Sequence, residues 1–224
     1  MTARRAWVAG VLVVLGLATA RLHAGGWAVV TMTIVPDHMI AGRGVTLSYA
    51  VRQHGVSLTP GLSGSIEAKD VRGRVVKAEA RPGSEPGYYE ATLTLPSPGD
   101  WTMTVVSGFW ATASVPVPVR VIAAGSAPPA IAAADRGAQL FAAKGCATCH
   151  THAAVAAAPG FAPDLSTPRF APEFLKAFLA DPSIKPRTMP NVEMPNLGLN
   201  DGEISALAVF LTTPAPLTKA VASR

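Results

Sequence analysis

The sequence has 224 residues, enough for two small domains or for one large domain behind an export segment. Its formal net charge is +5, and three of these charges come from a leader that holds three arginines and no acidic residue. Residues 25–122 and 123–224 each carry eight Lys/Arg against seven Asp/Glu. A nucleic-acid binder needs clustered basic side chains to replace the counterions of the phosphates. The charge distribution therefore argues against a nucleic-acid partner.

Residues 1–24 are predicted to be an export signal. Two arginines near the start precede an apolar run over residues 6–20, and small residues at Ala20 and Ala24 suit cleavage. The run is shorter than the roughly 20 apolar residues of a membrane span. We expect a periplasmic protein cleaved after Ala24. The alternative is an uncleaved leader that anchors the protein to the membrane.

Residues 25–122 are predicted to form an immunoglobulin-like β-sandwich. Apolar and polar residues alternate from Val45 to Arg52, so that one face of this strand is buried and the other meets water. Pro-Gly pairs such as Pro98-Gly99 separate such runs at intervals typical of short strands. The seven expected strands are 27–34, 45–53, 65–69, 74–79, 88–95, 101–107 and 117–122.

The segment from Gly87 to Val105 resembles the end of YtkA-like and CopC-like exported β-sandwich domains. CopC-like domains bind copper through histidine, so the resemblance implies a copper-handling module as an alternative function. The candidate ligands would be His38, Met32, Met39 and His54, whose spacing is poor for a metal site.

Residues 123–134 are rich in Ala, Pro, Gly and Ser and are expected to be a linker. Helical periodicity follows, and it predicts helices over 135–144, 171–180 and 201–212. Asn200 and Glu203 have the spacing of a capping box at the start of the third helix. Residues 135–218 are thus expected to be an all-α second domain.

Residues 146–150 read Cys-Ala-Thr-Cys-His, the attachment pattern of a c-type haem. Two thiols at this spacing reach the two vinyl groups of one porphyrin, and the next residue, His150, presents an imidazole to the iron. A disulfide or a redox dithiol between Cys146 and Cys149 is the alternative. It is not favoured, because no βαβ pattern surrounds the motif.

The second axial ligand of the iron is expected to be a methionine sulfur, which favours the reduced metal. Met194 and Met189 both precede a proline, which holds the backbone extended. Met194 is preferred because it leads straight into the capped helix, and Met189 remains the alternative.

The run from Arg136 to Phe141, the Cys-Ala-Thr-Cys-His motif, Met194-Pro195 and residues 203–211 together resemble a class I monohaem cytochrome c. The resemblance implies an all-α cytochrome c fold in which Gly137 and Phe141 pack against Phe210. It also implies that the Pro163 carbonyl accepts a hydrogen bond from the proximal imidazole, with Pro159 as the alternative. His152 is expected to face solvent rather than to bind iron.

These features predict a periplasmic electron carrier with one covalent haem c, which is not itself an enzyme. Its partners would be redox proteins, with a membrane-bound oxidase or reductase complex and peripheral membrane association as further expectations. The alternatives are a haem enzyme or gas-ligand sensor with an open sixth site, and a copper-handling module with an attached haem.

Overall fold

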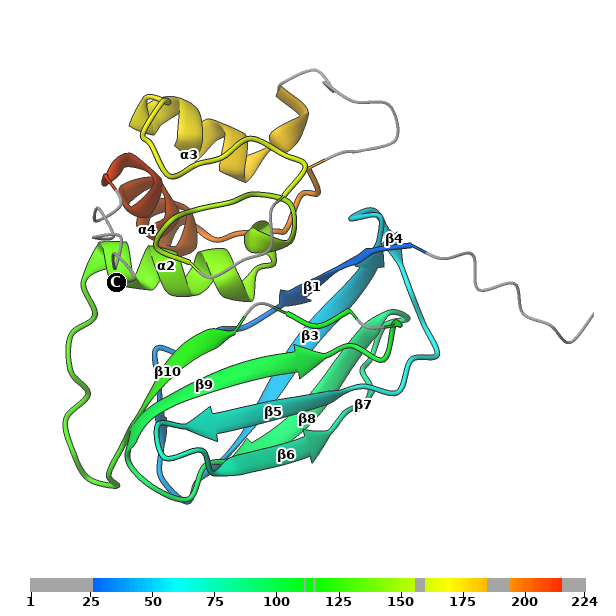
Figure 1. The fold of residues 1–224 in the computed structure, drawn as a ribbon, viewed down its shortest axis with the longest axis vertical. Helices are drawn as coiled ribbons and strands as arrows, with labels where there is room; N and C mark the ends of the chain where they lie inside the picture. Colours follow the sequence, from blue (N-terminus) through cyan, green and yellow to red (C-terminus); the bar gives the residue numbers. More distant parts are fainter. Residues whose placement is uncertain (1–25, 111, 115, 156–159, 185–193, 215–224) are drawn as a thin grey trace, which may run out of the picture.

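The computed structural model describes residues 26–110, 112–114, 116–155, 160–184 and 194–214. A β-sandwich forms one half of the molecule, and helices form the other half above it (Figure 1). The predicted export segment, Pro159 and Met189 lie outside the described residues. None of the helices among the described residues is long and apolar enough to span a bilayer.

The sandwich consists of two five-stranded sheets. The first has the order β1-β3-β8-β7, with β4 paired to β3, and the second has the order β2-β10-β9-β5-β6. Neighbours are antiparallel except β2 and β10, which are parallel. The strands are β1 Ala28–Met32, β2 His38–Ile40, β3 Gly44–Gln53, β4 Ser57–Leu58, β5 Ser65–Asp70, β6 Val75–Glu79, β7 Arg81–Pro82, β8 Tyr88–Thr94, β9 Gly99–Val106 and β10 Val117–Ile122.

The sandwich core follows from the alternation of side chains along the strands. Leu47 and Tyr49 of β3 are buried, and they face Trp101 and Met103 of β9, which are also buried. Because successive side chains of a strand point to opposite faces, these residues share the inner layer between the sheets.

All seven predicted strands are present, but the count of seven was incomplete. The additional strands β2, β4 and β7 have two or three residues each. Runs this short carry no detectable periodicity, and Pro82 in β7 disfavours a strand because it has no backbone N–H.

The second half contains α2 Ala133–Ala143, η1 Cys146–Thr148, α3 Pro172–Ala180, η2 Pro182–Ile184 and α4 Asp201–Thr212. Helices α2 and α4 cross at Gly137, where an added Cβ would overlap Ala206 and Phe210. The rings of Phe141 and Phe210 lie 5.6 Å apart beside this crossing. The expected packing of Gly137, Phe141 and Phe210 is therefore confirmed.

The capping box at the start of α4 is also confirmed. The Glu203 N–H donates to Asn200 Oδ1 at 3.0 Å, and the Asn200 N–H donates to Glu203 Oε2 at 3.3 Å. The two bonds satisfy backbone donors that have no partner inside the helix.

The helical half packs directly on the sandwich, with α2 lying along β1 and β10 (Figure 1). Gln139 of α2 donates to the Pro118 carbonyl at 2.8 Å, and Arg136 donates to the Val35 carbonyl at 2.8 Å. Arg136 also pairs with Asp37 at 3.0 Å. Buried apolar residues of both halves belong to one core cluster, so the two domains share an interface rather than only a linker.

Candidate haem site

The Cys-Ala-Thr-Cys-His motif forms a tight turn immediately after α2. Gly145, with a φ of 82°, reverses the chain in a conformation that favours glycine. The backbone N–H groups of Cys149 and His150 then donate to the Cys146 carbonyl at 3.2 and 2.9 Å. This single turn places both thiols and the imidazole within five residues on one compact segment.

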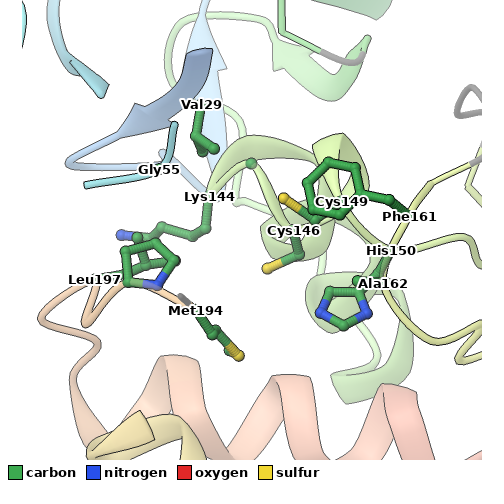
Figure 2. A pocket seen from close by; sticks show the side chains of 12 residues that line it. Val29, Gly55, Lys144, Cys146, Cys149, His150, Phe161, Ala162, Met194 and Leu197 are labelled. Carbon is green, nitrogen blue, oxygen red and sulfur yellow. The ribbon is translucent and has the colours of Figure 1, made fainter. Parts of the chain in front are cut away.

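An open cavity of about 530 Å³, including the part that opens to solvent, lies beside this turn. Figure 2 shows the side chains of Cys146, Cys149, His150 and Met194 around it. Met194 comes from the segment before α4 and faces the same cavity as the motif. The remaining lining residues are mostly apolar: Val29, Gly55, Lys144, Gly145, Phe161, Ala162, Pro195 and Leu197.

The loop after the motif folds back and orients the His150 ring. Gly160 lies against the Cys149 carbonyl so closely that any Cβ would overlap it. The Ala162 N–H donates to that same carbonyl at 3.0 Å. This brings the Pro163 carbonyl within 2.9 Å of His150 Nδ1, so that the Nδ1–H tautomer donates there and Nε2 is left for another partner.

The titration of the three motif side chains reflects their burial. Burial raises the pKa of the Cys146 thiol to about 12 and that of the Cys149 thiol to about 11. Burial lowers the pKa of His150, although the bond to Pro163 opposes this change. Burial therefore favours the uncharged form of each of these three side chains.

These residues fit a haem c. The group requires two thiols for thioether bonds, a neutral imidazole nitrogen, and an apolar cavity for the porphyrin. Cys146 and Cys149 provide the thiols, and His150 provides the imidazole. The cavity beside them is mostly apolar, and Met194 adds a thioether sulfur.

The prediction that His152 faces solvent was wrong. The side chain is only 3% exposed, and its ring lies 4.1 Å from Phe210 and 5.7 Å from Phe141. Its Nδ1 accepts from the Ala154 N–H at 3.2 Å. The His152 imidazole thus packs with the two phenylalanine rings beside the crossing of α2 and α4. The sequence of the loop has no periodicity from which this position could have been predicted.

The four candidate copper ligands are not brought together. Met32 and Met39 are fully buried in the sandwich core. His38 lies on β2 in one sheet, whereas His54 follows β3 in the other sheet and packs 5.8 Å from Trp27. In the part of the chain that the structure describes, no group of three or more His, Cys, Asp or Glu could hold a metal ion.

Sequence reasoning missed several cavity residues, among them Val29, Gly55, Lys144 and Gly145. A signal for Val29 existed, because residues 28–32 read Ala-Val-Val-Thr-Met and are apolar on both faces apart from Thr31. Such a strand is typically buried on both faces. No comparable signal marked Gly55, Lys144 or Gly145.

Comparison with known proteins identifies the second half. Residues 132–211 match the family model described as cytochrome c oxidase, cbb3-type, subunit III. No curated protein matches the chain.

Several solved structures share a similar arrangement over part of the chain. They include the Lin-41 filamin domain, which is 14% identical over 42% of this chain and 91% of that one, with a TM-score of 0.36. Trypsin-activated alpha-2-macroglobulin from Escherichia coli is 18% identical over 46% of this chain and 7% of that one, with a TM-score of 0.36. The ZirS C-terminal domain is 11% identical over 46% of this chain and 74% of that one, with a TM-score of 0.34.

The chain is therefore a two-domain protein in which a β-sandwich precedes a cytochrome c domain. A cytochrome c domain carries covalently bound haem c and has the role of an electron carrier rather than of a catalytic enzyme.

Proposed function

We propose that this protein is an exported carrier of single electrons, with one haem c held by Cys146 and Cys149 and ligated by His150 and Met194. Residues 25–122 would form the sandwich domain, 123–134 the linker and 135–218 the cytochrome domain. The observation that carries the proposal is the shared cavity, on which two thiols, an imidazole and a thioether converge from two distant segments.

When bound, haem c supplies an iron centre that changes its charge by one electron. The residues of this chain would hold and tune that centre. The hydrogen bond from His150 Nδ1 to the Pro163 carbonyl would fix the ring orientation and increase the basicity of Nε2. The mostly apolar lining would keep water away, and Met194 would occupy the position at which a substrate could otherwise bind.

The proposal includes the cellular location of the protein and its redox partners. Periplasmic location follows from the sequence of residues 1–24, either with cleavage or with the leader retained as an anchor. The partners would be other redox proteins that dock transiently, because rapid turnover favours a small interface. The family match of the cytochrome domain makes a membrane oxidase complex a reasonable electron acceptor.

The methionine ligand can be tested by substitution of each candidate. Met194→Ala should abolish the weak long-wavelength absorption that sulfur ligation gives ferric haem, lower the midpoint potential and allow carbon monoxide to bind the ferrous protein. The protein should be produced in a host that attaches haem c and studied by absorption spectroscopy and potentiometry.

Met189→Ala is the matched control and should leave all three properties unchanged. The reverse pattern would assign the ligand to Met189. Ready carbon monoxide binding by the unmodified protein would instead favour the haem enzyme or gas sensor.

A further inference from the structure

The first strand of the sandwich is buried on both of its faces. Ala28, Val30 and Met32 point into the sandwich core. Val29 and Thr31 alternate with them and point away from that core, yet they are only 2% and 4% exposed. The outer face of β1 is therefore covered, and what covers it is the cytochrome domain.

The covering segment is the end of α2 and the start of the haem motif. Thr31 Oγ1 donates to the Lys144 carbonyl at 3.3 Å, and Lys144 Nζ donates to the Thr33 carbonyl at 2.9 Å. A Cβ built on Gly145 would lie only 2.5 Å from the Val30 carbonyl oxygen. The backbone immediately before Cys146 thus rests directly on β1.

Because of this contact, residues of the sandwich form part of the cavity wall. Val29 and Gly55 line the same space as Cys146, His150 and Met194 (Figure 2). Gly55 is buried in the turn between β3 and β4. On the cytochrome side of the same boundary, the ring of Phe161 packs 5.0 Å from that of Trp27.

The Lys144 side chain also connects this contact between the domains to α4. The side chain is 3% exposed and pairs at 2.7 Å with Glu203, which is 12% exposed. Glu203 also closes the capping box with Asn200, at the end of the segment that starts at Met194. The Lys144 ammonium group therefore connects Thr33, the residue after β1, with the helix that follows the proposed methionine ligand.

We propose that β1 and the β3–β4 turn are a permanent wall of the haem pocket, in which Val29 helps to set the reduction potential of the iron. This inference rests on the proposed function. An apolar wall keeps water from that side of the pocket and so disfavours the more highly charged ferric state. Polar groups at Val29 should weaken this effect, because they bring dipoles and water toward the iron.

The test uses the full-length holoprotein with Val29→Thr and Val29→Asn. Both should lower the midpoint potential, Asn more than Thr, while the absorption spectrum keeps the features of the original ligands. Neither new side chain is ionisable, so charge at the substituted position does not complicate the comparison.

Val75→Thr and Val75→Asn are the matched controls, because Val75 is 55% exposed on β6, the outermost strand of the other sheet. They should leave the potential unchanged. Val29→Thr keeps the β-branched shape of the side chain and replaces one methyl group by a hydroxyl, so it can decide the question even if Val29→Asn fails to fold.

Two outcomes separate the two proposals. If the unmodified protein shows histidine–methionine ligation but the Val29 variants keep its potential, the wall proposal is overturned and the function proposal stands. If the unmodified protein lacks that ligation, the proposed function itself is wrong.

Discussion

Lys144 shows at the scale of a single residue how the two domains are joined. It is the last residue before the Gly145 turn, and its nearly buried ammonium pairs with Glu203 and donates to the Thr33 carbonyl. Removing one partner of a buried ion pair is costly because the other charge is left in a poorly solvated position. Lys144 is therefore expected to contribute more to stability than its place in the sequence suggests.

Lys144→Met keeps the length of the side chain but removes its charge and its donors. We expect the free energy of unfolding to fall by roughly 3 kcal/mol, because Glu203 then has no counter-ion. Urea unfolding followed by circular dichroism measures the change. Adding Glu203→Gln should recover part of the loss, since the amide removes the unpaired charge and keeps the capping geometry.

The control for this change is Lys77→Met. Lys77 pairs with Glu79 at 2.9 Å, but the two side chains are 50% and 74% exposed. Exposed pairs contribute less than about 1 kcal/mol, so the control should be nearly neutral. Equal losses in the two variants would mean that Lys144 is no more important than a surface lysine.

At the scale of elements, the hairpin of β5 and β6 is closed by Asp70. Its Oδ1 accepts from the backbone N–H groups of Arg72 and Arg74 at 2.9 and 2.8 Å, and its Oδ2 accepts from the Arg74 guanidinium. Desolvation alone would raise the pKa of this carboxyl, but the hydrogen bonds from Arg74 and Arg72 outweigh it and lower the pKa below its ordinary 3.8.

The hairpin should accordingly have an acid-sensitive component of stability. A carboxyl whose pKa is lower in the folded than in the unfolded protein stabilises the fold fully above its unfolded pKa. That contribution is lost as the pH falls through the lower, folded pKa. Asp70→Asn keeps an oxygen for the two backbone donors but removes the charge that faces Arg74.

We expect Asp70→Asn to be less stable than the unmodified protein at neutral pH, and the difference to shrink as the pH falls below 3.8. Thermal unfolding of both proteins across this range measures it. A difference that stays constant with pH would show that the carboxylate charge has no part in the effect.

At the scale of the whole molecule, the two domains are expected to behave as one body. Arg136, Gln139 and Lys144 bond to backbone carbonyls of the sandwich, and apolar residues of both domains share one buried cluster. The chain between β10 and α2 is largely exposed, and residues 123–130 make up most of it. The interface, rather than this connection, should hold the domains together.

A protease site inserted between Gly125 and Ser126 tests this expectation. After cleavage the two fragments should still elute together in size-exclusion chromatography, because the interface contacts do not depend on the peptide bond. The same cleaved sample should separate in denaturing urea, which verifies that the cut is complete. Separate elution in native buffer would contradict the expectation.

The sequence predicted several features that depend on neighbouring residues. Alternation along single strands indicated the seven longer strands, and the spacing of Asn200 and Glu203 indicated the cap of α4. The haem attachment motif and its histidine could be recognised because the two cysteines and the histidine lie within five consecutive residues.

The features that sequence reasoning missed depend on contacts between distant segments. The buried position of His152 results from the crossing of α2 with α4. The bond between Lys144 and the Thr33 carbonyl joins positions 111 residues apart. Local patterns report which face of an element is apolar, but they do not report which other element covers it.

The sequence alone therefore determined that this chain has a β-sandwich, a helical cytochrome domain and a haem attachment motif. The two domains were predicted from the periodicity of apolar residues, and the motif from the spacing of its cysteines and histidine. Only the tertiary structure decided that the sandwich lines the haem pocket through Val29 and Gly55. The physical reason is that burial of the outer face of β1 and of the Lys144 ammonium is achieved only when the two domains pack together.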